Sequence, residues 1–339
     1  MLVLREGVVT EAAEVAPEQQ LVVDVPGRGP RAATADTALV GPCEIGDSVV
    51  INTAAADLAL GSGGFDIVHV NLTRGLGGDG ASGAHVMKLN YSSLQHAVIP
   101  VEDASEGLPE GRPVGVCFLH GQLAPFAWAV AQARAGTRLG FIQAAGGALP
   151  GGHSRTVADL RARGLLAGTV TAGSSYGGEA EAISLAGALA YGLTELGWDA
   201  AVIAPGPGII GSGSRFGHGG MAALDAAHTA LALGCPVIVA PRMSSSDERE
   251  RHQGCSHHTQ TVLDLLLAPV SVGAPVGSGE SIGRGCGHSI VEVEVDLAAY
   301  DESGLPATTM GRSIEDDPLF FGAALAGGAL LGSQLDVAS

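Results

Sequence analysis

Histidine side chains occur where this sequence could support acid–base chemistry or metal binding, two roles that imidazole fills near neutral pH. The segment RERHQGCSHHT places His257 and His258 directly after Ser256, a residue type that caps helices. The positive end of a helix dipole favours neutral rings there, and neutral rings act as bases or as metal ligands. We therefore predict His257 as a general acid or base. His120, which follows the apolar run PVGVCFL, is a second one.

A divalent metal ion is a further use for these histidines. His218, in the run SRFGHGG, could meet His257 or His258 in a cleft, together with His120. Glu179 would then supply an oxygen ligand. The histidine spacing matches no standard zinc template, and adjacent residues of a helix point about 100° apart. The segment RERHQGCSHHT alone therefore does not predict a complete metal site, and the cofactor stays open.

A third signal is the glycine-rich stretch from Gly206 to Gly220, which follows an apolar run and precedes a helical one. This is the context of a loop that binds phosphate through backbone N–H groups. The stretch lacks the Gly-Lys-Ser/Thr ending of a Walker A loop, and GPGIIG only loosely matches the dinucleotide fingerprint. We predict an anion-binding loop, and a tight turn whose glycines serve only packing is the alternative.

The predicted ligand-binding residues come from this stretch and from two other loops that follow strand-like runs. They are Gly206, Gly208, Gly211, Ser212, Gly213, Ser214, Arg215, Ser175, Gly177 and Arg242. In a parallel sheet such loops share the carboxyl edge, where ligands bind. The expected ligand is a small phosphorylated or carboxylated metabolite, and the expected reaction is hydrolysis or group transfer. A non-catalytic homo-oligomeric binding or assembly protein is the alternative, because small-residue helices such as ISLAGALAYG suit subunit interfaces.

The elements that must position these residues follow a change of pattern along the chain. Residues 1–101 contain short alternating or β-branched runs separated by turn signals, which predicts a small all-β, barrel-like domain. Residues 102–113 are polar and rich in Gly and Pro, as in a linker. In residues 114–339, five apolar runs alternate with helical stretches. This pattern predicts a doubly wound, mostly parallel, three-layer α/β domain of Rossmann-like type.

Three local predictions complete this outline. The stretch GEAEAISLAGALAYGLTELG is predicted as one helix, with Glu179 and Glu181 in its first turn. The alternating run SIVEVEVDL is predicted as an edge strand. The run FFGAALAGGALLG is too short to span a bilayer and is predicted as a buried helix or an interface.

Composition limits the classes of partner. The formal net charge is −18, from 17 Lys and Arg against 35 Asp and Glu, so nucleic acid and anionic membrane surfaces are not expected partners. An acidic protein can still bind phosphate through backbone N–H groups. The five cysteines form no CxxC pair, and the N-terminal residues do not resemble a signal peptide. These features predict a cytoplasmic protein with reduced thiols.

Four segments together resemble an uncharacterised bacterial family, a domain of unknown function. They are VMKLNYSSLQ, SSYGGEAEA, GPGIIGSGSRFGHGG and RERHQGCSHHT. The resemblance extends from the β-rich N-terminal region to about Pro275. It implies a stand-alone cytoplasmic bacterial protein with a β-rich N-terminal part and an α/β C-terminal part, and it implies no activity.

Overall fold

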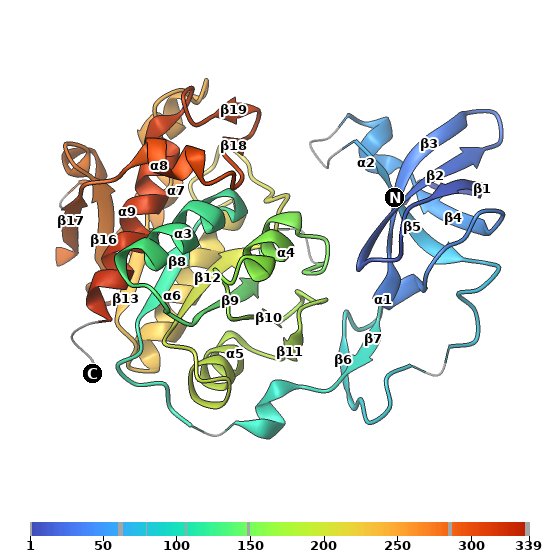
Figure 1. The fold of residues 1–339 in the computed structure, drawn as a ribbon, viewed down its shortest axis with the longest axis horizontal. Helices are drawn as coiled ribbons and strands as arrows, with labels where there is room; N and C mark the ends of the chain where they lie inside the picture. Colours follow the sequence, from blue (N-terminus) through green and yellow to red (C-terminus); the bar gives the residue numbers. More distant parts are fainter. Residues whose placement is uncertain are drawn as a thin grey trace. The chain divides into compact units, whose positions relative to one another are not determined.

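The structure is a computed structural model that describes residues 2–59, 64–78, 80–105, 107–147, 150–283 and 287–335. The chain divides into two compact units, Met1–Ile99 and Pro100–Ser339. Figure 1 shows the elements of both. The segment predicted as a linker belongs to the second unit, where η1 (Val101–Ala104) begins it. Glu102 of η1 accepts hydrogen bonds from the backbone N–H groups of Ile183 and Ser184.

The N-terminal unit is a closed five-stranded barrel with the strand order β1-β2-β3-β5-β4. Its strands are β1 (Leu4–Ala12), β2 (Glu18–Val25), β3 (Gly29–Asp36), β4 (Ser48–Asn52) and β5 (Asp66–Asn71). Strands β3 and β5 pair in parallel, and the other pairs are antiparallel. Alternate side chains such as Leu21 and Val23 fill the interior. The barrel-like domain predicted from the alternating runs is therefore confirmed.

Short elements complete this unit. Helix α1 (Thr37–Val40) follows β3, and Asp36 caps it by accepting from the backbone N–H groups of Ala38 and Leu39. Helix α2 (Ala54–Asp57) follows β4, and β6 (Val86–Lys88) pairs with β7 (His96–Val98).

The second unit is built on an eight-stranded parallel sheet with the order β11-β10-β9-β12-β8-β13-β16-β17. Its strands are β8 (Val114–Cys117), β9 (Leu139–Ala144), β10 (Gly168–Ala172), β11 (Ala180–Ala182), β12 (Ala200–Pro205), β13 (Val237–Ala240), β16 (Ser271–Pro275) and β17 (Ser289–Val293). The parallel α/β architecture is as predicted. The strand order is not the usual dinucleotide-binding order, because β12 lies between β8 and β9.

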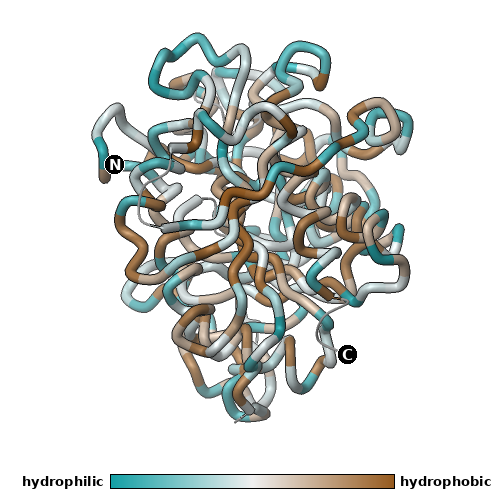
Figure 2. Tube along the Cα trace, turned by 90° about the vertical axis from the view of Figure 1, so that its left-hand side faces the viewer, coloured by the Kyte–Doolittle hydropathy of each residue, from teal (hydrophilic) through white to brown (hydrophobic). Residues whose placement is uncertain are grey.

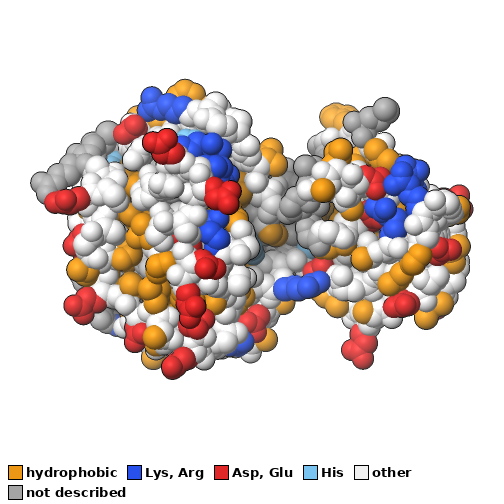
Figure 3. Space-filling model, turned by 90° about the horizontal axis from the view of Figure 1, so that it is seen from above, with side chains coloured by type: hydrophobic (Ala, Val, Ile, Leu, Met, Phe, Trp, Pro, Cys, Tyr) orange, Lys and Arg blue, Asp and Glu red, His pale blue; other side chains and the backbone are white. Residues whose placement is uncertain are grey.

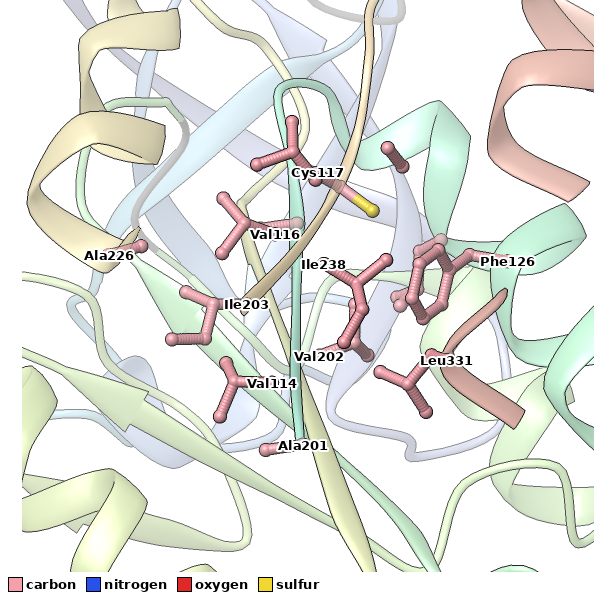
Figure 4. Close-up of a cluster of buried hydrophobic side chains, with 14 of the residues drawn as sticks. Val114, Val116, Cys117, Phe126, Ala201, Val202, Ile203, Ala226, Ile238 and Leu331 are labelled. Atoms are coloured by element: carbon pink, nitrogen blue, oxygen red, sulfur yellow. The ribbon is translucent and has the colours of Figure 1, made fainter. Parts of the chain in front are cut away.

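Helices cover both faces of this sheet. They are α3 (Leu123–Ala133), α4 (Arg155–Ala162), α5 (Leu185–Ala190), α6 (Ala222–Ala232), α7 (His257–Leu265), α8 (Leu297–Glu302) and α9 (Pro318–Gln334). Figure 4 shows Ala226 of α6 on one side of β8, and Phe126 of α3 with Leu331 of α9 on the other. Helix α4 packs beside α3, whereas α5 and α7 pack beside α6. The unit therefore has three layers.

Short segments connect these elements. They are η2 (His120–Gln122), the π-helical η3 (Tyr191–Glu195), η4 (Gly219–Met221), η5 (Glu250–His252), η6 (Gly279–Ile282), β14 (Met243–Ser244), β15 (Gly254–Cys255), β18 (Thr308–Thr309) and β19 (Arg312–Ser313).

Helix α9 accounts for the apolar run near the C-terminus. Its small residues allow close approach, since a methyl group on Gly327 would lie 2.7 Å from the Cβ atom of Ala240. Figure 2 shows hydrophobic residues along interior segments and hydrophilic residues in outer loops. The prediction of a buried helix is confirmed.

Across the described ranges, no helix combines the length and hydropathy needed to cross a membrane.

The helix predicted from GEAEAISLAGALAYGLTELG begins later than expected. Glu179 and Glu181 are not in a helical turn, because Ala180–Ala182 forms β11 beside β10. The Glu181 carboxylate accepts hydrogen bonds from the Thr171 hydroxyl and the Gly177 backbone N–H. The helix starts at Leu185, where Ser184 is the N-cap. By contrast, β17 lies at the sheet edge as predicted.

Candidate functional site

Three histidines converge near the carboxyl ends of β12 and β13. His218 lies in the loop after β12, whereas His257 and His258 begin α7. One ring nitrogen from each lies within 4.8 Å of the others. The cap predicted for α7 is present, because the Ser256 hydroxyl accepts a hydrogen bond from the His258 backbone N–H. We call His218, His257 and His258 the histidine cluster.

His218 directs a lone pair into the cluster. Its Nε2 lies 2.9 Å from the backbone carbonyl oxygen of Arg215, and a carbonyl only accepts, so Nε2 carries the proton. Nδ1 is therefore the acceptor nitrogen, and it is buried with no hydrogen-bond partner in the described part of the chain. Gly220 leaves space beside it, since a Cβ atom there would lie 3.0 Å from His218 Nδ1 and 3.2 Å from His258 Nδ1. Burial is the main reason why the pKa of His218 is lowered.

His258 is held by an arginine. Its Nδ1 lies 3.0 Å from Nη1 of Arg242, and a guanidinium group only donates, so Nδ1 accepts and the neutral ring carries its proton on Nε2. The ring also stacks on that of His218. Burial, followed by the charge of Arg242, lowers the pKa of His258 to about 2.

His257 and His252 complete the imidazole environment. Nε2 of His257 is buried and has no hydrogen bond to any described residue, and burial lowers the pKa of this ring. The ring centroid of His252 lies 5.0 Å from that of His257. Nδ1 of His252 is hydrogen-bonded to the Ser256 hydroxyl at 2.8 Å, and burial lowers its pKa to about 3. All four rings are therefore neutral at physiological pH.

A network of arginines and aspartates adjoins these rings. Buried Asp247 accepts two hydrogen bonds from the Arg249 side chain, at 2.8 and 2.7 Å. Arg242 and Arg312 each place a nitrogen 3.7 Å from its Oδ2 atom. Arg312 also donates to buried Asp317, while its Nη2 is buried without a hydrogen bond. Three guanidinium groups thus face two carboxylates, which leaves an excess of one positive charge.

This excess of positive charge affects the pKa of Arg242. Burial, and next the charge of Arg249, lowers its pKa to about 10. The hydrogen bond from Arg249 is the largest influence on Asp247, whose pKa is lowered. Figure 3 shows basic side chains gathered close to histidines on the α/β unit. In a protein with a net charge of −18, such a region favours an anion.

The histidine cluster has the donor set of a catalytic metal site. Three imidazole nitrogens and one open position are typical of catalytic zinc. Zinc–nitrogen bonds of about 2.1 Å place tetrahedral nitrogens about 3.4 Å apart, so modest ring movements would close the set. The stacked His218 and His258 rings must tilt, because the bonding lone pair lies in the ring plane. Arg242 must also release His258 Nδ1 for that nitrogen to bind a metal.

Two predicted metal candidates lie elsewhere. His120 does not belong to the cluster, because its Nε2 is 2.7 Å from the Ser154 hydroxyl. Glu179 pairs with Arg161, with a 2.7 Å separation, and accepts from the Thr169 backbone N–H. The structure therefore brings together His218, His257 and His258, without His120 or Glu179.

The tip of the glycine-rich stretch is exposed, from Gly211 to Gly217. The backbone N–H groups of Ser212, Ser214 and Gly217 donate within the loop. Ser212 N donates to the Gly217 carbonyl at 2.7 Å, and Gly217 N donates to the Ser214 hydroxyl at 3.0 Å. Arg215 pairs with Asp264 across 3.2 Å. These backbone N–H groups and the Arg215 side chain therefore already have partners within the protein.

Glycine is required where this stretch meets its neighbours. A methyl group on Gly219 would overlap the carbonyl oxygen of Gly146, in the loop after β9. Gly206 is buried at the end of β12, and Gly208 has a φ of 77°. Tight packing, the alternative weighed for this stretch, therefore accounts for several glycines.

The other predicted ligand residues have defined positions. Ser175 accepts a hydrogen bond from the Gln143 amide at 2.7 Å, and Gly177 has a φ of 80°. Arg242 donates a hydrogen bond to His258 of the histidine cluster, and the Arg215 backbone carbonyl accepts one from His218. Asp247 and Arg312 could not be identified from the sequence as site residues. Asp247 belongs to DERER (residues 247–251), which resembles an exposed charge run, and Arg312 lies far along the chain.

Comparison with known proteins places the chain in one family. No curated protein and no solved structure matches the sequence. A family model described as "Protein of unknown function (DUF3866)" matches residues 32–328, which include β4 and β5 of the barrel, the end of β3 and the whole histidine cluster. The resemblance to an uncharacterised family is thus confirmed, and the chain belongs to the DUF3866 family of proteins of unknown function.

Proposed function

We propose that the α/β unit is a metal-dependent hydrolase that acts on a small anionic metabolite. The observation that carries this proposal is the convergence of three neutral imidazoles within 4.8 Å. Two of them, His218 and His257, have buried ring nitrogens without hydrogen-bond partners among the residues that the structure describes. Because an unpaired buried acceptor is costly, such nitrogens favour a ligand that accepts their lone pairs.

A metal bound by three histidines keeps one position for water. Divalent zinc lowers the pKa of bound water to about 7, which supplies a nucleophile at neutral pH. The protein's own part is to hold the three rings neutral, which burial does, and to fix the tautomer of His218 through the Arg215 carbonyl. The hydrogen bond to that carbonyl is a typical outer-shell contact of a metal ligand.

The arginines beside the cluster define the proposed substrate. Arg242 and Arg312 contribute to the local excess of positive charge, and a phosphate or carboxylate would balance it. Among the residues predicted to bind ligand, Arg242 is the one proposed to contact the anion. The glycine-rich stretch contributes His218 and the space at Gly220.

An activity assay tests this function. Chelator-treated protein and protein reloaded with zinc, manganese or magnesium would be assayed with a phosphomonoester. We expect hydrolysis only after reloading, and loss of that hydrolysis in His257→Ala. Equal activity before and after chelation would reject the metal-dependent function.

A homo-oligomeric binding protein is the second candidate, and one observation favours it. The barrel exposes large apolar side chains on its strands, among them Leu4, Val8 and Ile67. Exposed apolar surface is typical of interaction sites. Light scattering tests this candidate, because a stable oligomer that falls apart in Val8→Asp would support it. A cytoplasmic location fits both candidates, since Cys43, Cys117, Cys235 and Cys255 are free buried thiols.

A further inference from the structure

A serine and a histidine form a buried pair outside the histidine cluster. The Ser154 hydroxyl oxygen lies 2.7 Å from Nε2 of His120. Ser154 is 5% exposed and begins α4, after β9, whereas His120 follows β8. The two residues therefore lie in loops at the carboxyl edge of the same sheet, one after β8 and one after β9.

The hydrogen bonds around Ser154 orient its proton. Its oxygen accepts from the Val157 backbone N–H at 3.1 Å, as an N-cap does. The single hydroxyl proton is then free to point at His120, so that Nε2 accepts and Nδ1 carries the ring proton. Among the described residues, Nδ1 of His120 is buried without a hydrogen bond of normal geometry. The backbone carbonyl of Pro205 is the acceptor near this ring, and it raises the pKa that burial lowers.

The pair lies where open α/β sheets bind ligands. β12 sits between β8 and β9, and the helices that follow them leave on opposite faces, α6 on one and α3 and α4 on the other. In open α/β sheets, ligands bind beyond the carboxyl ends of the strands at such a change of direction. His120 follows β8 and lies near both neighbouring strands, since its ring centroid is 6.1 Å from that of Phe141 of β9, and the backbone carbonyl of Pro205 of β12 raises its pKa.

We propose that Ser154 is a nucleophile activated by His120, and that it takes the acyl group of a carboxylic ester. The Ser154 oxygen bonds to the ester carbonyl carbon while its proton passes to His120 Nε2. The ester C–O bond then breaks, and the departing alcohol oxygen takes that proton. Water hydrolyses the acyl-serine by the same proton transfers in reverse, which releases the acid and restores both residues. The N-terminus of α4 stabilises the negative charge that develops during each step.

This activity goes beyond the proposed metal-dependent function and shares no residue with it. A fluorophosphonate probe tests it on the intact chain in the presence of chelator, because the probe phosphonylates an activated serine without a metal. We expect one label per chain, mapped to Ser154 by peptide mass spectrometry. His120→Gln should slow labelling about 100-fold or more, the usual contribution of a general base.

A matched control separates capping from nucleophilicity. Ser184 caps α5 through the Gly187 backbone N–H, as Ser154 caps α4, so Ser184→Ala should keep full labelling and Ser154→Ala should lose it. Mapping of the label on the unchanged chain does not depend on the folding of any variant. Labelling at another residue, labelling only after metal is added, or an unmodified Ser154 after long exposure would each overturn the proposal. Each of these results leaves the metal site to be judged by its own assays.

Discussion

His218 and His258 stack face to face, with ring centroids 3.6 Å apart and planes 9° from parallel. The rings come from the loop after β12 and from the start of α7, so the contact fastens two separate segments together. Two imidazolium rings could not share this position, because their charges would repel each other. Burial lowers the pKa of both rings, so the stack is a pair of neutral rings, and a metal ion bound by both must tilt them apart.

Removal of His257 should weaken metal binding more than folding. His257 is only partly buried, and its Nε2 makes no hydrogen bond. His257→Ala is expected to lower zinc affinity about 100-fold or more, since even outer-shell changes cost 10- to 100-fold. Isothermal titration measures the affinity, and urea unfolding of the chelated protein measures stability. His69→Ala, on β5 of the barrel, is the control and should match the unchanged chain.

Replacement of Arg242 should affect metal and anion in opposite directions. Arg242→Gln removes a positive charge beside His258, so zinc should bind more tightly, by about tenfold. Inorganic phosphate should bind about 10- to 100-fold more weakly, the effect of a lost charged hydrogen bond. Arg163→Gln, which breaks a surface pair with Asp159, is the control for both titrations. Phosphate binding that survives Arg242→Gln but disappears in Arg215→Gln would return the anion site to the glycine-rich loop.

Gly219 should be intolerant of any side chain. A methyl group there would overlap the Gly146 carbonyl oxygen, so Gly219→Ala must shift one of the two loops and with it His218. We expect a loss of about 1–3 kcal/mol in the free energy of unfolding, together with weaker zinc binding. Gly213→Ala is the matched control, because the nearest atoms to its methyl group would be those of Arg251, 4.0 Å away. Equal stability of the two variants in urea would show that the close approach is absent.

His120 should make stability depend on acid pH. Burial lowers its pKa to about 4, whereas an unfolded histidine titrates near 6.5. As the pH falls from about 6.5 toward 4, the unfolded chain takes up a proton that the folded chain does not, so stability decreases. Between pH 7.5 and pH 5, His120 alone should lower the free energy of unfolding by about 2 kcal/mol. Urea unfolding at both pH values should show that loss shrink by about that amount in His120→Gln, and an unchanged loss would mean that the ring is not buried.

Much of the fold could be predicted from local patterns. Each of the strands β8, β9, β10, β12 and β13 is an apolar run bounded by turn residues, and Ser256 is a recognisable cap. β11 and β16 gave no such signal, because AEA is short and charged and SVGAP contains Gly and Pro. The position of β12 between β8 and β9 depends on long-range pairing, which local patterns do not specify.

The histidine cluster was predictable only in part. The cap at Ser256 located His257 and His258 at the start of α7, and this holds in the structure. Their meeting with His218 requires the loops after β12 and β13 to converge, which follows from the strand order. Asp247 resembles a solvated charge in DERER, yet it is buried and lies within 4 Å of the guanidinium groups of Arg249, Arg242 and Arg312.

Titration of chelator-treated protein with zinc tests the metal site most directly. We expect one zinc ion per chain, with zinc at 100 times its dissociation constant adding about 2.7 kcal/mol of stability. We also expect His218→Ala and His258→Ala each to abolish most of this binding. Absence of saturable binding, or binding that both variants retain, would contradict the assignment of His218, His257 and His258 as a metal centre.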